Sequence, residues 1–224
     1  MADSQRIILE LANVASGYGN RAVLTGVGIS VGKGELIVIE GATGAGKTTL
    51  IRLLLGVQPA RSGYVRVLGS DVARVSSATL TQLRRQMGVV FQIPQFLAQE
   101  SVMTNVALPL LIAGISSSKS RALATRALMD AGLTGSARKR PGQLSGGEQA
   151  RLQIARALIH HPQLILADEP FAHLDPESVA AAESLLATAH ARGSAVLITT
   201  HSPTRLADRA VRYRMEGGKL ACQS

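Results

Sequence analysis

The stretch "GATGAGKTT", from Gly41 to Thr49, constrains the fold of this chain more than any other segment. It follows an apolar strand pattern, "ELIVIE", and leads into a helical pattern, "KTTLIRLLLGV". In that setting the spacing G-x-x-x-x-G-K-[ST] turns successive backbone N–H groups toward one phosphate, and the positive end of the helix strengthens the attraction. Lys47 is placed to reach the β- and γ-phosphates of a nucleotide, and the Thr48 hydroxyl to bind Mg²⁺. The alternative, a glycine-rich turn without a ligand, does not account for the complete spacing.

Two adjacent acids follow a second apolar run, in "LILADEP". An acid at the carboxyl end of a strand in an α/β sheet is suited to a Mg²⁺ contact, and we assign that part to Asp168. One carboxylate is enough for the metal, so Glu169 is left to orient and polarise an attacking water. Acids that only cap a strand are the alternative, which the pairing with the phosphate loop disfavours.

A third pattern, "SGGE" from Ser145 to Glu148, opens the helical segment "GGEQARLQIARAL". Ser and Glu at this spacing predict a capping box, in which each side chain accepts a hydrogen bond from the other's backbone N–H. Gly146 and Gly147 remain unexplained, because each costs a helix about 1 kcal/mol relative to Ala. The usual reason for such a cost is close approach of the backbone to another group, and a phosphate at the helix N-terminus fits.

Composition narrows the remaining choices. Hydrophobic residues make up 46% of the 224 residues and aromatic residues only 3%, so Val, Ile, Leu and Ala must build the core, as in a parallel α/β sheet. The single cysteine, Cys222, suits a reducing compartment. The N-terminal sequence "MADSQRIILELANV" has no signal-peptide pattern. The longest apolar run, 106–115, is shorter than the roughly 20 residues that span a bilayer.

The chain carries a formal net charge of +9. Three interpretations compete: a solvated basic surface, proximity to an anionic membrane, and binding of nucleic acid. The arginines are scattered along the chain and no aromatic residues alternate with them, so stacking on single-stranded nucleic acid is disfavoured. We therefore favour the solvated surface, place membrane proximity second, and expect no nucleic-acid partner.

Hydrophobic periodicity predicts one α/β domain made of two parts. Residues 1–92 and 162–224 form a nucleotide-binding core, and residues 93–161 form an inserted helical part without convincing strands. In the core, short alternating runs over 6–31 indicate antiparallel strands. Further predicted strands cover 35–41, 64–69, 88–92, 163–168 and 194–200, predicted helices cover 47–57, 79–87, 176–193 and 202–209, and two weak strands end the chain.

"LSGGEQ" followed by "ARLQIARAL", upstream of "LILADEP", resembles the signature of ABC ATPases, and the whole chain resembles their nucleotide-binding domain. Further residues match the family's motifs in the family's order: Tyr18 matches the aromatic residue that stacks on adenine, Gln92 the Q-loop glutamine, Asp175 in "AHLD" the D-loop aspartate, and His201 after "LITT" the switch histidine. The resemblance implies a P-loop NTPase core with an antiparallel β subdomain and an inserted α-helical subdomain.

The resemblance also implies the site and its chemistry. The implied ligands are ATP and Mg²⁺, the implied metal contacts are Thr48, Gln92 and Asp168, and the implied catalytic residues are Glu169, His201 and Gln92. The implied nucleotide-binding residues are Tyr18, Gly41, Ala42, Thr43, Gly44, Ala45, Gly46, Lys47, Thr48, Thr49, Ser145, Gly146, Gly147, Glu148 and Asp175. Two chains are expected to form a head-to-tail homodimer on binding ATP, with each ATP held by the phosphate loop of one subunit and the signature of the other.

"LRRQMGVVFQ", "VMTNVALPLLIAG" and "LADEP" together resemble one subgroup, which includes the cell-division ATPase FtsE, the lipoprotein-release ATPase LolD and MacB-type efflux ATPases. We favour FtsE, which implies an integral membrane partner similar to FtsX and a peripheral location on the cytoplasmic face of the inner membrane. LolD- or MacB-like export and a soluble non-transport ABC ATPase are the alternatives. The chain departs from the subgroup at Phe171, Ala172 and His173, at Ile93–Pro94 and at Ala150.

Overall fold

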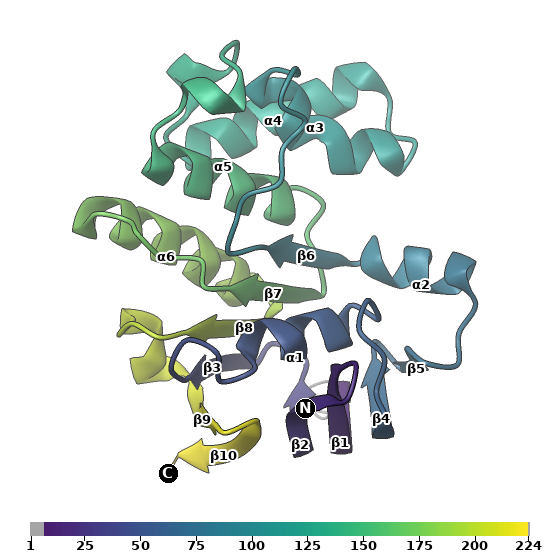
Figure 1. Ribbon diagram of the computed structural model, residues 1–224. Coiled ribbons are helices and arrows are strands. Elements are labelled where there is room, and N and C mark those ends of the chain that lie inside the picture. Colours follow the sequence, from purple (N-terminus) through teal and green to yellow (C-terminus); the bar gives the residue numbers. More distant parts are fainter. Residues whose placement is uncertain (1–6, 224) are drawn as a thin grey trace.

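The computed structural model describes residues 7–223, which form two sheets and a group of helices (Figure 1). Residues 1–6 and Ser224 are outside the described range. The N-terminal segment in which no signal peptide was predicted therefore lies partly outside it. The larger sheet has six strands in the order β10-β9-β3-β8-β7-β6, and only the β9–β10 pair in it is antiparallel. Its strands are β3 (Leu36–Glu40), β6 (Met87–Val90), β7 (Leu164–Asp168), β8 (Ala195–Thr200), β9 (Val211–Glu216) and β10 (Lys219–Gln223).

The smaller sheet is antiparallel and has the order β2-β1-β4-β5. It consists of β1 (Ile7–Tyr18), β2 (Arg21–Gly32), β4 (Ser62–Val67) and the two-residue β5 (Ser70–Asp71). The alternating pattern of 6–31 therefore predicted this hairpin correctly. Its buried residues, among them Leu9, Leu24 and Val65, join the same core as the larger sheet.

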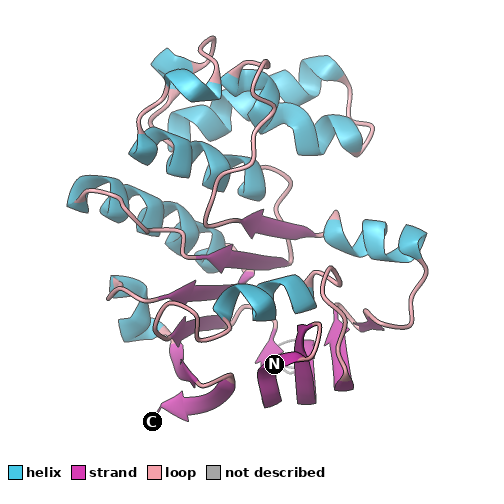
Figure 2. Cartoon of the chain, viewed as in Figure 1, coloured by secondary structure: helices cyan, strands magenta, loops and turns pink. Residues whose placement is uncertain are grey.

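The inner strands β3, β7 and β8 and the edge strand β6 are mainly apolar and buried, because helices cover both faces of this part of the sheet (Figure 2), whereas β9 carries exposed Arg and Glu. In β3, Ile37 and Ile39 point toward the core that includes α1 (Lys47–Leu54), whereas Leu36 and Val38 belong to the core that includes α6 (Pro176–Ala191). Outside residues 93–161, the described chain also has the short helix α2 (Ser77–Arg84) and the 3-10 turn η3 (Arg205–Arg209). The predicted helix over 202–209 is thus a shorter 3-10 turn.

Between β6 and β7, the described chain has helices and no strand. These are α3 (Val102–Ile112), α4 (Ser117–Asp130) and α5 (Gly146–Leu158), with the 3-10 turns η1 (Thr134–Ser136) and η2 (Pro141–Gln143). They share a separate apolar core that contains Val106, Leu128 and Leu152. No helix within residues 7–223 is long and apolar enough to cross a membrane.

Strand β6 ends earlier than the pattern predicted. The apolar run indicated a strand over 88–92, but β6 stops at Val90, and Phe91 and Gln92 are exposed. β6 is the edge strand, paired only with β7, and its last ladder partner is Ala167. The backbone of Phe91 bonds instead to the side chain of Gln153 on α5, so the chain leaves the sheet at this point.

His160 lies where α5 returns to the larger sheet. Its Nε2 is 3.2 Å from the carbonyl oxygen of Met87 at the start of β6, and its buried Nδ1 has no hydrogen-bond partner. Burial lowers the pKa of His160, against the opposing effect of the Met87 carbonyl, and neighbouring His161 lowers it further. A lowered folded-state pKa means that the unfolded chain binds a proton first as pH falls.

We predict that the contribution of His160 to the free energy of unfolding is constant above its ordinary pKa, about 6.5. The free energy of unfolding should decrease as pH falls below that value. Urea denaturation between pH 7.5 and pH 5, compared for wild type and His160→Gln, measures the effect. The variant is expected to lose less stability on acidification, whereas His161→Asn, at the exposed neighbour, retains most of the wild-type slope. Equal pH slopes for wild type and His160→Gln would contradict the assignment.

Candidate functional site

The phosphate loop joins the carboxyl end of β3 to the start of α1. Gly44 and Gly46 have φ angles of 83° and 113°, which side chains rarely adopt, so the loop requires glycine at both positions. Their surroundings differ. A Cβ on Gly46 would lie 2.8 Å from Leu24 Cδ2, whereas nothing lies within 4 Å of one on Gly44. Gly46 is thus fixed by packing, and Gly44 leaves its backbone open to a ligand, as a phosphate nest requires.

Lys47 turns back over the loop and reaches the next-but-one strand. Its Nζ lies 2.6 Å from the carbonyl oxygen of Gly41, 3.0 Å from that of Ala42 and 3.0 Å from Oε1 of Glu169. Both side chains of this ion pair are buried, at 5% and 6% exposure, so the pair is desolvated. The pair joins the loop after β3 to the end of β7.

Glu169 is bound on its other oxygen as well. Oε2 accepts a hydrogen bond from the backbone N–H of His201 at 3.1 Å and lies 2.8 Å from His201 Nδ1. Because an ionised carboxylate only accepts, this contact places the imidazole proton on Nδ1. Glu169 also has a φ of 48°, unusual for a residue with a side chain, and its N–H bonds to the carbonyl oxygen of Thr199. Backbone strain of this kind concentrates at functional sites.

Asp168 has only 2% of its surface exposed, and its carboxylate is hydrogen-bonded by a residue of the neighbouring strand. The hydroxyl of Thr199 on β8 donates to its Oδ1 at 2.7 Å. Among residues 7–223 no cluster of three or more His, Cys, Asp or Glu side chains offers a metal site. A site built from Asp168, the Thr48 hydroxyl and nucleotide oxygens has the hard oxygen donors that Mg²⁺ takes, so the residues fit this ion. Gln92, the third predicted contact, makes no hydrogen bond within the described chain.

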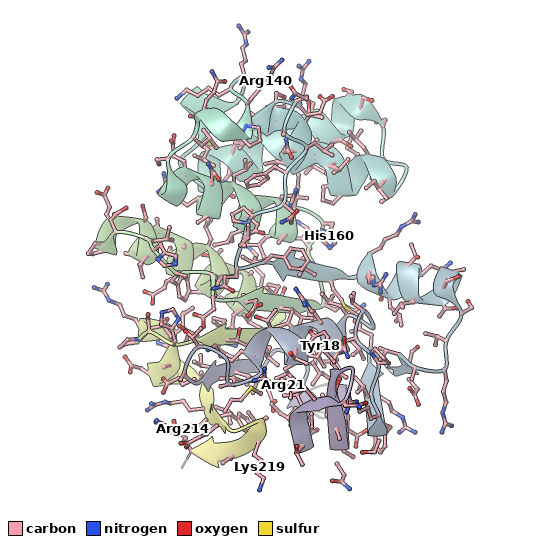
Figure 3. The ribbon with its side chains drawn as sticks, viewed as in Figure 1. Tyr18, Arg21, Arg140, His160, Arg214 and Lys219 are labelled. Carbon is pink, nitrogen blue, oxygen red and sulfur yellow. The ribbon has the colours of Figure 1, made fainter. Side chains whose placement is uncertain are left out.

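Tyr18 is the last residue of β1 and pairs with Arg21, so it lies at a strand end and not in a loop (Figure 3). Its side chain is 45% exposed, and its hydroxyl accepts a bond from Arg52 on α1 at 3.2 Å. Hydrogen bonding with Thr49, and secondly with Arg52, lowers the pKa of Tyr18. An exposed ring at the first turn of α1 suits the predicted stacking on adenine, which stays a prediction.

The capping box predicted at 145–148 is confirmed. The N–H of Glu148 donates to Ser145 Oγ at 3.3 Å, and the N–H of Ser145 donates to Glu148 Oε2 at 2.9 Å. The Ser145 N–H holds the pKa of Glu148 below its usual value, with a smaller contribution from the hydroxyl of Ser136. Ser145 and Gly146 are both exposed at the helix start.

The expected close approach of the backbone to another group is found at Gly147, where that group is a side chain of the same chain, and the phosphate contact stays a prediction for both glycines. A Cβ on Gly147 would lie 2.0 Å from Oγ and 2.8 Å from Cβ of Ser178, so this glycine is required by packing within the chain. Ser178 in turn holds Asp175, donating to its Oδ1 from the backbone at 2.9 Å and to its Oδ2 from the hydroxyl at 2.6 Å. These bonds lower the pKa of Asp175. A Cβ on Gly146 would meet no atom within 4 Å, so packing within the described chain does not require glycine there.

The predicted residues thus gather in two places. Glu169 contacts both Lys47 and His201, and the three residues lie near the ends of β3, β7 and β8, which are adjacent in the order β3-β8-β7. The start of α5 lies in the helical part, with β7 and α6 between it and α1 (Figure 1). Within residues 7–223 no hydrogen bond or ion pair joins Ser145, Gly146 or Gly147 to the phosphate loop.

The sequence profile of ABC transporter ATP-binding domains, described as "ABC transporter", matches residues 24–172. The cell-division ATP-binding protein FtsE of Haemophilus influenzae is 38% identical over 196 residues, which cover 87% of this chain and 90% of that protein. The lipoprotein-releasing ATP-binding protein LolD of Porphyromonas gingivalis is 40% identical over 75% of this chain and 78% of its own length. The methionine import protein MetN of Rhizobium johnstonii is 39% identical over 87% of this chain and 54% of its own length.

The chain belongs to the ABC transporter family. A solved dimeric bacterial ABC transporter cassette superposes with a TM-score of 0.88 at 30% identity, covering 95% of this chain and 96% of that one. A second dimeric cassette, in a post-hydrolysis state bound to ADP and phosphate, gives 0.88 at 28% identity, over 96% of this chain and 98% of that one. The fold predicted from the sequence is confirmed, and the protein is an ATPase of the ABC type.

Three supporting residues of this ABC cassette were missed from the sequence: Thr199, which holds Asp168, Ser178, which holds Asp175, and Gln153, which holds Phe91. Their partners are between 3 and 62 residues away, and none stands at a motif position. The sequence offered one signal for these three residues: Thr199 is a hydroxyl residue near the end of a predicted strand, directly before "THS".

Substitution of each glycine by alanine should separate their roles. Gly147→Ala is expected to lower the thermal midpoint, because the added methyl overlaps Ser178 and overpacking costs about 1–3 kcal/mol. Gly146→Ala should leave stability equal or slightly higher, because the methyl meets no atom and Ala is the better helix former. Differential scanning calorimetry on the nucleotide-free proteins measures both. Equal midpoints would mean that Gly147 is not packed as described.

Proposed function

We propose that this cassette is the ATPase subunit of an FtsE-type complex, which dimerises on ATP and acts on an integral membrane partner similar to FtsX. The FtsE relative supports the proposal, because its match covers nearly all of both chains. Such a subunit would be peripheral, on the cytoplasmic face of the membrane. We also propose that residues 1–92 and 162–224 form its nucleotide-binding core and residues 93–161 a helical subdomain.

The observation that carries the dimer is the exposed start of α5. A positive helix end with an open glycine and an exposed serine is a suitable phosphate site, and within residues 7–223 the hydrogen bonds of Ser145 go to the first turn of its own helix. A second copy in head-to-tail arrangement would bring its phosphate loop to this helix start. Each ATP would then lie between Lys47 of one subunit and Ser145 of the other. Asp175, packed through Ser178 behind Gly147, would lie at the same interface.

Within one subunit, the ion pair gives an order of events. Lys47 neutralises Glu169 while the site holds no phosphate. The γ-phosphate of ATP competes for Lys47, and Oε1 of Glu169 is then free to accept a proton from an attacking water. Oε2 stays bound to His201, which keeps the carboxylate oriented toward the phosphate. Mg²⁺, held by Thr48, Asp168 and Gln92, would supply neutralisation of charge on the phosphate oxygens.

The membrane partner is proposed to dock beside Gln92. The adjoining segment exposes apolar side chains, with Ile93 73% exposed and Leu97 43%, and Ile112 at the end of α3 is 54% exposed. Ile93–Pro94 stands where the subgroup has an acidic residue, so this surface favours an apolar contact. No nucleic acid is proposed as a partner.

The LolD relative favours a second candidate, an ATPase for lipoprotein release or MacB-like efflux. Its sequence identity to this chain is 40%, against 38% for the FtsE relative. The third candidate, a soluble ABC ATPase, differs from the first two in having no membrane partner. Crosslinking in native membranes, followed by identification of the bound integral protein, separates the three. Recovery of a nucleic-acid enzyme in place of a membrane protein would overturn the proposal.

The variant Ser145→Arg should leave ATP binding by the monomer within about twofold of wild type, because Ser145 has no contact with its own phosphate loop. It should abolish ATP-dependent dimerisation and hydrolysis, because the bulky, positively charged arginine side chain blocks the helix start. Equilibrium titration with a fluorescent ATP analogue and a phosphate-release assay provide the two readouts. Loss of monomer binding would place the segment on the wrong side of the interface.

Glu169→Gln should slow steady-state hydrolysis by at least about 100-fold, as expected when a general base is removed. Because bound ATP is then not consumed, light scattering should detect a stable dimer in ATP and Mg²⁺, and a monomer in ADP. Hydrolysis at the wild-type rate would exclude Glu169 as the base. A monomer in ATP, with the membrane partner present as well, would contradict the dimer.

A further inference from the structure

The segment between β6 and α3, residues 91–101, has neither helix nor strand, and side chains of α3 and α5 hold it, among them Gln153, Arg156 and Asn105. Gln153 Oε1 accepts from the N–H of Phe91 at 3.0 Å, and its Nε2 donates to the carbonyl oxygen of Phe91 at 2.9 Å. The guanidinium of Arg156 lies 5.1 Å from the centre of the Phe96 ring. Asn105 on α3 bonds both the N–H and the carbonyl oxygen of Leu97.

Two of these three anchors come from one face of α5. Gln153 and Arg156 are three residues apart, so they lie side by side on the helix. Gln153 is only 2% exposed, and its amide replaces the strand partner that Phe91 lacks beyond the end of β6. Between the anchors, Gln92, Ile93 and Gln95 are exposed, so the anchored segment presents a short free loop.

The same helix carries the proposed trans phosphate site at its N-terminal end. Gln153 lies about two turns from Ser145 on the continuous helix α5, so the two positions move together. The residue that Gln153 holds, Phe91, directly precedes Gln92. One rigid element therefore connects the backbone beside the proposed metal contact with the helix start that serves the partner subunit's nucleotide.

We propose that Gln153 is a positioning residue that links the two ATP sites of the dimer, by holding Gln92 and the Ser145–Gly147 helix start in one rigid body. The inference rests on the proposed dimer function. ATP bound in one subunit moves Gln92, the bidentate amide transmits the movement to α5, and the helix start approaches the nucleotide of the other subunit. The link is a mechanical one, so it affects dimer formation and leaves nucleotide affinity of the single subunit unchanged.

Two substitutions at Gln153 separate hydrogen bonding from packing. Gln153→Met fills a similar volume and removes both bonds to Phe91, whereas Gln153→Glu keeps the bond from the Phe91 N–H and loses the one to its carbonyl oxygen. Arg151→Met is the matched control. It removes another side-chain bond from α5, to the carbonyl oxygen of Ala131 at 3.1 Å, which leads into the helical part and away from Gln92.

All variants are made in the Glu169→Gln background, so that ATP is not consumed. Light scattering gives the ATP concentration for half-maximal dimerisation, titration with a fluorescent nucleotide gives the affinity of the monomer, and calorimetry gives the thermal midpoint. We expect Gln153→Met to raise the ATP concentration needed for dimerisation by about tenfold, because misplacement by an ångström has effects of that order or larger. Gln153→Glu should fall between Met and wild type, and monomer affinity should stay within about twofold of the background.

The outcomes are distinguishable. If Glu169→Gln alone fails to dimerise in ATP, the proposed function fails, whatever Gln153 does. If it dimerises, and Gln153→Met behaves like Arg151→Met, the inference about Gln153 is wrong and the amide only caps the end of β6. A loss of monomer affinity in both Gln153 variants, in parallel with dimerisation, would also overturn it, because the residue would then act on the site of its own subunit.

Discussion

The buried ion pair between Lys47 and Glu169 is the interaction on which the functional site depends. It connects the phosphate loop after β3 to the end of β7, across the intervening strand β8. Desolvated pairs are expensive to break on one side only, because the remaining charge is left buried. Here the carboxylate keeps a second set of bonds to His201, so a phosphate can take Lys47 without leaving Glu169 alone. The positive φ of Glu169 is held by the bond from its N–H to the carbonyl oxygen of Thr199 on β8 and by the contacts of its carboxylate with Lys47 and His201.

The helix α5 is the second constraint on the site, because it contacts residues that are far from it in the sequence. Its start is free, its middle holds the segment after β6, and its first turn packs against the start of α6 through Gly147 and Ser178. The two contacts connect the helical part to β6 and to α6 in spite of its separate core. The proposed head-to-tail dimer would explain two anion sites in one chain, since each site would then serve a different nucleotide.

The fold was largely predictable from the sequence because its signals are local. Continuous apolar runs predicted β3, β7 and β8, glycine spacing predicted the loop after β3, and Ser145 with Glu148 predicted the helix start. What could not be predicted depended on contacts far apart in the chain. The end of β6 is set by Gln153, 62 residues away from Phe91, and Gly147 is required by Ser178. A pattern along the chain cannot indicate either, because a small residue facing a ligand and one facing a neighbouring helix look the same.

The most direct test of the ion-pair account is the ATP affinity of a single subunit. In the Ser145→Arg background, which is designed to prevent dimerisation, the dissociation constant for ATP is measured with Glu or Gln at position 169. If Lys47 is held by the carboxylate in the nucleotide-free state, Glu169→Gln releases it and removes a negative charge beside the phosphates, so ATP should bind about tenfold more tightly. Unchanged or weaker binding would contradict the claim that Glu169 restrains Lys47 until phosphate arrives.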